Sequence, residues 1–156
     1  MFGIGGTGSR VIKSLTMLLA SGVKLSDDFD TVVPLIIDPD AANGDLNRTT
    51  DILNKYQKIN KETTSKEGLF STKIATMKQV LNDNATGLAE HFIFGMSNTG
   101  QKFGEFIDYN GLDEENRSLV DLLFSNENLE ADMTVGFKGN PNIGSIVLNR
   151  FSGSDE

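Results

Sequence analysis

The feature that most constrains the fold is a run of glycines close to the start of the chain. The stretch "GIGGTGSR" (Gly3–Arg10) holds four glycines within six residues, directly after a short apolar segment. From Ser9 to Ser21, apolar residues then recur at the spacing of an amphipathic helix. Glycine lets a backbone approach a phosphate closely, and a helix start offers free N–H groups and the positive end of its dipole. The run therefore predicts a strand, a phosphate-binding loop and a helix. The predicted binding residues are Gly3, Gly5, Gly6, Thr7, Gly8 and Ser9.

A second candidate loop follows the stretch "TVVPLII" (Thr31–Ile37). This stretch is β-branched and almost continuously apolar, which is typical of a buried strand in a parallel sheet, although Pro34 cannot donate to a sheet ladder. Ligands of α/β folds bind at the carboxyl ends of the strands. The polar residues that come next are therefore candidates for contacts to a ribose, a base or a cation: Asp38, Asp40 and Asn43. The alternative, left open here, is that Asp38 and Asp45 only cap a turn and a helix.

The rest of the chain continues the alternation of strands and helices. Apolar spacing predicts helices from Asp45 to about Ile59 and from about Ser71 to Leu81, and a buried leucine-rich helical stripe over 119–123. A short strand is expected over Ala131–Phe137, followed by the loop "GNPNIG" and a helix from Ile143. This third loop adds the candidate residues Gly139, Asn140 and Asn142. The order of elements predicts an α/β fold, with a Rossmann-like, mostly parallel sheet and helices on both faces.

Length and composition set the limits of this fold. The 156 residues suit one domain, which we expect to span residues 1–151, with residues 152–156 as a polar tail. The first apolar segment is short for a central strand, so we expect the domain to be a fragment of a larger protein. A net charge of −8 with scattered basic residues argues against nucleic acid as a partner. The absence of cysteine, of a long apolar run and of a leader peptide favours a cytoplasmic protein without a membrane segment.

A dinucleotide such as NAD is one possible ligand of the glycine run. The spacing Gly3-x-Gly5-x-x-Gly8 satisfies the dinucleotide fingerprint, which expects an acidic residue about 20 positions further on to bind a ribose hydroxyl. Asp38, however, follows Gly8 by 30 residues. The longer gap weakens the dinucleotide interpretation without removing it.

The three loops together resemble the N-terminal nucleotide-binding half of the tubulin and FtsZ superfamily. "GIGGTGSR" is similar to the first glycine-rich loop of that family, and "IIDPDAA" resembles its second loop, which also follows a strand. "GNPNIG" resembles its third loop, where a Gly is followed by Asn or Asp, Pro and a further Gly. The combination is most similar to bacterial tubulin-like proteins of obscure function.

The resemblance implies that the chain binds GTP or GDP, with Mg²⁺ on the phosphates. By position, Gly5, Gly6, Thr7 and Gly8 would contact the phosphates. Asp38, Asp40 and Asn43 would lie near the ribose or a cation. Gly139, Asn140 and Asn142 would close over the terminal phosphate. Self-association or another protein partner is also implied, because members of this family assemble.

Two parts of the family pattern do not occur in the sequence. There is no glycine-rich fourth loop such as Gly-Gly-Gly-Thr-Gly, and no acidic catalytic loop that would act on the nucleotide of a neighbouring subunit. We therefore expect this chain alone not to hydrolyse a nucleotide efficiently. No catalytic residue and no metal ligand is assigned.

Two other classes of protein remain as alternatives. The first is an ATP-binding adenylating enzyme of the ubiquitin-activating type, because "DPDAANGDLNR" imitates its Asp-x-Asp and Asn-Leu-x-Arg elements with Asp38, Asp40, Asn47 and Arg48. Those enzymes generally need a cysteine, which this chain lacks. The second is a non-enzymatic scaffold that binds a protein and whose glycine loops are vestigial.

Overall fold

A computed structural model describes residues 1–40, 42–63, 68–81, 91–94 and 101–152 of the chain, with side chains as far as residue 149. The chain groups into two compact units, Met1–Gly95 and Met96–Asp155, and each is described by itself. From the sequence alone, residues 1–151 are expected to form one domain. The predicted polar tail, apart from Ser152, falls outside the described residues.

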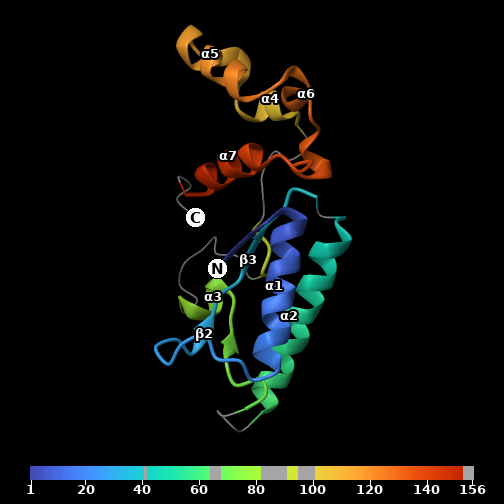
Figure 1. Ribbon diagram of the computed structural model, residues 1–156, viewed down its shortest axis with the longest axis vertical. Helices are drawn as coiled ribbons and strands as arrows, with labels where there is room; N and C mark the ends of the chain where they lie inside the picture. Colours follow the sequence, from blue (N-terminus) through green and yellow to red (C-terminus); the bar gives the residue numbers. More distant parts are fainter. Residues whose placement is uncertain (41, 64–67, 82–90, 95–100, 153–156) are drawn as a thin grey trace. The chain divides into compact units, whose positions relative to one another are not determined.

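Unit 1 begins with a strand, a helix and a second strand that returns beside the first. Strand β1 spans Phe2–Ile4, and helix α1 spans Gly5–Ala20 without an intervening loop. Strand β3 spans Leu35–Ile37 and lies parallel to β1, with Ile4 opposite Ile37. A parallel connection of this kind needs a crossover, and α1 supplies it (Figure 1).

The predicted strand Thr31–Ile37 is divided into two short strands. Strand β2, Thr31–Val32, comes first and pairs in parallel with β4, Lys73–Ile74. Pro34 has no N–H group to donate, and it lies at the break between β2 and β3. The prediction of a buried parallel strand is therefore confirmed for β3, whose three residues are all buried.

Strand β3 also has a parallel neighbour on the side away from β1. Ile36 bridges Ile93, because the Ile36 N–H donates to Phe92 O at 2.7 Å and the Phe94 N–H donates to Ile36 O at 2.8 Å. The observed fold is thus mixed α/β with parallel strand pairing. A complete Rossmann-like sheet with helices on both faces is more than these short strands provide, and it stays a prediction.

Two long helices cover the strands of unit 1. The helix predicted from Asp45 to about Ile59 is α2, which spans Gly44–Glu62 and lies beside α1 (Figure 1). The Thr49 hydroxyl lies between the two helices, within hydrogen-bonding distance of Ser9 O on α1 at 3.0 Å and of Asp45 O on α2 at 2.7 Å. Thr49 itself is fully buried. This contact holds the N-terminal halves of α1 and α2 against each other.

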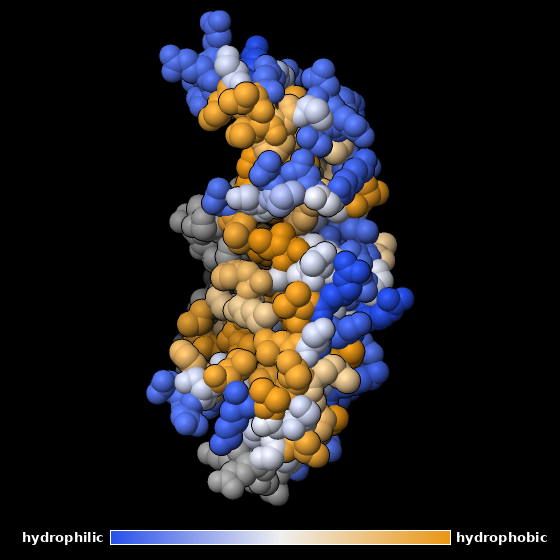
Figure 2. Space-filling model, in the orientation of Figure 1, coloured by the Kyte–Doolittle hydropathy of each residue, from blue (hydrophilic) through white to orange (hydrophobic). Residues whose placement is uncertain are grey.

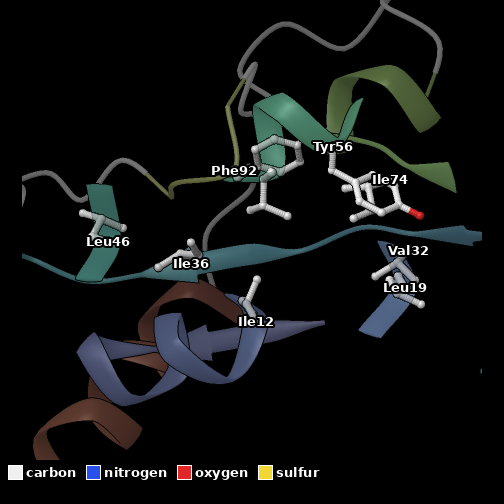
Figure 3. Close-up of a cluster of buried hydrophobic side chains, with 9 residues drawn as sticks. Ile12, Leu19, Val32, Ile36, Leu46, Tyr56, Ile74 and Phe92 are labelled. Atoms are coloured by element: carbon white, nitrogen blue, oxygen red, sulfur yellow. The ribbon is translucent and has the colours of Figure 1, made fainter. Parts of the chain in front are cut away.

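The hydrophobic core of unit 1 lies between β3 and the two helices. Figure 3 shows Ile12 of α1, Ile36 of β3 and Leu46 of α2 within one cluster of buried side chains. Tyr56 and Phe92 belong to the same cluster. Its members come from every strand of unit 1 except β1, which explains why the short strands hold together. The cluster consists of Ile12, Leu19, Val32, Ile36, Leu46, Leu53, Tyr56, Ile74 and Phe92.

The apolar stripe predicted on α1 is wider than the face that the helix buries. Ile12 and Leu19 are almost completely buried, whereas Val11 and Leu18 are 55% and 52% exposed. Residues 11 and 18 lie on one row of the helix surface, and 12 and 19 lie on the adjacent row. Figure 2 shows broad apolar areas on the visible face of the molecule.

The helix predicted from Ser71 to Leu81 is wrong over its first half. Residues Lys73–Ile74 form β4, and only Met77–Val80 form a helix, α3. The helix starts late because Thr76 caps it: the Thr76 hydroxyl accepts from the Gln79 N–H, and the Gln79 side chain accepts from the Thr76 N–H. This reciprocal capping box marks Thr76 as the boundary.

Unit 2 is built from short helices. They are α4 (Phe103–Phe106), the 3₁₀ helix η1 (Tyr109–Gly111), α5 (Glu114–Leu123), α6 (Asn126–Leu129), the 3₁₀ helix η2 (Met133–Val135) and α7 (Pro141–Ser152). Phe103 and Phe124 pack with ring centroids 4.9 Å apart, and both are buried. The predicted buried stripe on α5 is wrong, since α5 buries no residue and Leu122 is 82% exposed. The spacing of apolar residues identifies an apolar helix face, but it does not show whether another element packs against that face.

The strand predicted over Ala131–Phe137 is also wrong. Its centre is the 3₁₀ helix η2, preceded by a single antiparallel bridge between Lys102 and Asp132. The turn forms because the Asp132 carboxylate accepts from the Thr134 N–H at 2.8 Å. Local side-chain bonds of this kind compete with strand formation.

Candidate functional site

The first two candidate loops come together at the carboxyl ends of β1 and β3. The strands are parallel and end in register at Ile4 and Ile37, so Gly5 and Asp38 follow at the same edge. Both α1 and α2 begin there, and Thr49 joins their N-terminal halves. The glycine run and the acidic loop therefore lie at the same edge of the β1–β3 pair within unit 1.

The glycine run forms the first turn of α1 and is not a separate loop. Gly5 begins the helix with φ +64°, a conformation that glycine adopts at little cost. The preceding residue, Ile4, has no side chain that can cap the helix, and the first turn carries no acidic residue. The free N–H groups at this helix start thus face no protein carboxylate of their own turn. By contrast, side chains cap α2, α3, α5 and α6.

Gly3 and Gly8 pack the strand against the helix. A methyl group added at Gly8 would lie 2.5 Å from the carbonyl carbon of Gly3, and one added at Gly3 would lie 3.0 Å from Gly8 O. No side chain fits at either position. These two glycines act by allowing α1 to approach β1, as in the helix–strand contact of nucleotide-binding folds.

Gly6 faces the start of α2. A methyl group added at Gly6 would lie 3.0 Å from Asn43 Nδ2 and 3.8 Å from Asp45 Oδ2. A side chain at Gly6 would therefore have to displace the Asn43 amide, so the starts of the two helices lie in close contact here.

The two hydroxyl residues of the run have different environments. Ser9 is fully buried, and its hydroxyl donates to Gly5 O at 3.2 Å. Thr7 is exposed, and its hydroxyl accepts from the Arg10 guanidinium at 3.2 Å. Of these two residues, only Thr7 presents its hydroxyl at the surface. The Ser9 hydroxyl instead stabilises the first turns of α1 through its bond to Gly5 O.

The acidic loop is organised by its own hydrogen bonds. Asp38 Oδ1 accepts from the Asp40 N–H at 3.1 Å, and Asp38 Oδ2 accepts from Asn43 Nδ2 at 3.0 Å. Asn43 in turn caps α2, because its Oδ1 accepts from the Asp45 N–H at 2.9 Å. The alternative from the sequence is that Asp38 caps a turn and Asp45 caps a helix. Asp38 does stabilise the turn, but the residue that caps α2 is Asn43.

Burial shifts the pKa of the Asp38 carboxyl. This residue is only 5% exposed, and burial raises the pKa of its carboxyl above the usual value of 3.8. The nearby Asp40 carboxylate also raises this pKa, while the hydrogen bonds from Asp40 N–H and Asn43 lower it. Asp40 is less buried, and one of its oxygens accepts from the Ala42 N–H. Asp40 is therefore the more accessible of the two carboxylates.

Sequence reasoning missed an ionic cluster at the same place. The Asp45 carboxylate lies 3.6 Å from the Arg10 guanidinium of α1 and 3.6 Å from the Arg48 guanidinium of α2. The signal was present, since Arg10 closes the quoted glycine stretch and Arg48 belongs to the Asn-Leu-x-Arg-like element. What the sequence lacks is the pairing of α1 with α2 that brings these charges together.

The third candidate loop belongs to unit 2. Asn140 is the cap of α7, because its Oδ1 accepts from the Asn142 N–H at 3.0 Å and from the Ile143 N–H at 3.4 Å. Gly139 has φ +75°, and its position has open space around it. Asn142 is exposed. The ligand contacts of these three residues stay a prediction of the resemblance.

Searches for metal sites, membrane spans and relatives add three findings. Among the residues that the structure describes, no group of three or more His, Cys, Asp or Glu side chains is placed to hold a metal ion. In the same part of the chain, no helix has both the length and the apolar character needed to cross a bilayer. Comparison with protein-family models, curated proteins and solved structures gave no match.

Proposed function

We propose that the protein binds a nucleotide by its phosphates at the start of α1, beside the start of α2. The observation that carries this proposal is the uncapped first turn of α1, which contains neither a capping side chain nor an acidic residue. Free N–H groups at a helix start attract anions, and the helix dipole adds to this attraction. Thr7 supplies an exposed hydroxyl at the same turn.

The charged groups nearby define how a phosphate is accommodated. Arg10 and Arg48 lie on the two helices, and each contacts Asp45 at 3.6 Å. Arg10 also donates to the Thr7 hydroxyl. Both guanidinium groups are exposed, so they can turn toward a phosphate. Asp40, in the acidic loop, is only partly buried and keeps an accessible carboxylate. Mg²⁺ bound to the phosphates would be attracted by Asp40 and would offset the repulsion between the two anions.

The resemblance to tubulin-like proteins makes GTP or GDP the preferred ligand of this proposal. One structural observation favours NAD or ATP as the second candidate. Asp38 directly follows the strand that pairs with β1, and this is where a dinucleotide-binding fold keeps its ribose-binding acid. The residues between Gly8 and Asp38 form the rest of α1, the segment after it, and strands β2 and β3. Against this, both oxygens of Asp38 accept hydrogen bonds from the protein's own loop.

The test is a calorimetric titration of the full chain with GTP, GDP, ATP and NAD, each with and without Mg²⁺. We expect GTP or GDP to bind, and Gly6→Val to abolish binding because its side chain clashes with Asn43 at the start of α1. Ser14→Val is the matched control, because it adds the same side chain at an exposed position further along α1. Circular dichroism shows whether both variants fold.

Three other outcomes each have a definite meaning. If the protein bound ATP or NAD but not GTP, the second candidate ligands would be supported. Binding of no nucleotide would contradict the proposal and favour the scaffold alternative. Equal binding by Gly6→Val and the parent chain would show that the start of α1 is not the phosphate site.

A further inference from the structure

A pocket of about 460 Å³ lies at the opposite end of unit 1 from the glycine run. The residues that line it belong to the segment between α1 and β2, to the end of α2 and to the segment that leads into β4. Figure 1 shows where these segments lie. Asp30 and Lys73 join these walls, because the Lys73 N–H donates to Asp30 O at 2.8 Å. The volume falls within the range of small-molecule sites, about 300–1,000 Å³.

Four charged side chains of both signs line this pocket. They are two cations, Lys24 and Lys73, and two anions, Asp27 and Asp30. In the part of the chain that the structure describes, no ion pair forms among them, and Lys24, Asp27 and Lys73 make no side-chain hydrogen bond. All four residues are exposed, and charges that line one pocket without pairing with each other are available to a ligand.

Further features of the walls indicate what kind of ligand would fit. The pocket lies at the end of α2, where the negative pole of the helix dipole favours a positive group. Phe29 lines the pocket and is 68% exposed, so its ring offers an apolar surface to a bound molecule. The hydroxyl of Ser71, another wall residue, is buried with no hydrogen-bond partner in the described structure.

We propose that this pocket binds a small zwitterion, namely a free amino acid. The carboxylate of the ligand pairs with Lys24 and Lys73, and its ammonium group pairs with Asp27 and Asp30. Its side chain lies against Phe29. A ligand with one charge of each sign satisfies both pairs of residues. A nucleotide does not, because its phosphates would approach two carboxylates and a helix carboxyl end. This site is independent of the proposed nucleotide site.

The first test is a calorimetric titration of the full chain with the common amino acids at millimolar concentration. For the best ligand, the amide that lacks the carboxylate and the N-acetyl derivative that lacks the ammonium group are titrated in parallel. We expect each blocked derivative to bind at least about tenfold more weakly, which is the loss of one charge-assisted interaction. Equal binding of a blocked derivative, or no binding by any amino acid, would overturn the proposal.

Charge-removing variants locate the site. Lys24→Gln and Asp27→Asn are each expected to weaken binding by about tenfold. Lys58→Gln is the matched control, because Lys58 is an exposed lysine of α2 that does not line the pocket. Equal weakening by Lys58→Gln would mean that only the net charge matters, and the proposal would fail. Gly6→Val should leave amino-acid binding unchanged, which separates this site from the nucleotide site.

Discussion

The side chain of Asn43 joins the buried Asp38 carboxylate to the start of α2. Its Nδ2 donates to Asp38 Oδ2 at 3.0 Å, while its Oδ1 accepts from the Asp45 N–H at 2.9 Å. One amide group thus caps a helix and stabilises a buried acid, and it does so directly beside Gly6. The carboxyl edge of β1 and β3 depends on this residue for its local order.

Replacing Asn43 with alanine should lower the free energy of unfolding by about 2 kcal/mol. The substitution removes a helix cap and leaves an oxygen of Asp38 without its partner. Chemical denaturation monitored by circular dichroism measures the change. Asn54→Ala is the control, because Asn54 is exposed on α2 and its replacement should change stability by no more than about 0.5 kcal/mol. Similar values for the two variants would contradict the role of Asn43.

Asp38 should make stability depend on pH in the direction opposite to most carboxyl groups. Because its pKa is raised in the folded protein, the folded state holds the proton more tightly than the unfolded state does. The stabilising contribution is therefore complete below the usual value of 3.8 and is lost as the pH rises through the pKa of the folded protein. Denaturation of the parent chain and of Asp38→Asn over this range measures the effect. The free-energy difference between the two proteins should shift in favour of Asp38→Asn as the pH rises. A difference that does not vary with pH would refute this.

Gly8→Ala and Gly44→Ala should have opposite effects. Alanine normally stabilises a helix relative to glycine by up to about 1 kcal/mol, and Gly44→Ala should follow this trend because its new methyl group lies 3.7 Å from the nearest atom. At Gly8 the methyl group would lie 2.5 Å from the backbone of Gly3, so this variant should lose about 1–3 kcal/mol. Thermal unfolding of the two variants decides the matter, and a stabilised Gly8→Ala would show that α1 does not lie this close to β1.

Thr49→Val and Thr50→Val test the contact between α1 and α2. Valine keeps the shape of threonine but removes the hydroxyl. The Thr49 hydroxyl reaches both Ser9 O on α1 and Asp45 O within α2, whereas the Thr50 hydroxyl donates to Leu46 O within α2. Thr49→Val should therefore cost about 1–2 kcal/mol, and Thr50→Val less than about 0.5 kcal/mol. Denaturation curves of the pair give both values. If the two losses were equal, the cross-helix bond would contribute nothing to stability.

The first half of the fold was largely predictable from the sequence. Helices α1 and α2 and the buried strand β3 follow from periodicity and β-branched composition, because each buries one face against the others. The segment 71–81 was not predictable in this way. Its apolar spacing suits a helix, but β4 pairs with β2, and this long-range pairing overrides the local preference. On α5 the spacing identified an apolar face correctly but could not show that the face stays exposed.

The candidate site was predictable in outline but not in its division of roles. Parallel strands imply that Gly5 and Asp38 share an edge, and the structure agrees. The sequence could not distinguish Gly3 and Gly8, which pack the helix on the strand, from Gly6, which faces Asn43. That distinction depends on distances of a few ångströms between backbones. For the same reason the position of Asp45 between Arg10 and Arg48 appears only in the folded chain.

The grouping of the chain into two compact units has a consequence for spectroscopy. The sequence contains two tyrosines and no tryptophan. Tyr56 lies in the core of unit 1, and Tyr109 lies in unit 2. Each unit therefore carries its own intrinsic fluorophore. In a Tyr109→Phe variant all the tyrosine emission comes from unit 1, and in Tyr56→Phe it all comes from unit 2. The unfolding of each unit can then be followed separately in an otherwise intact chain, without any added dye.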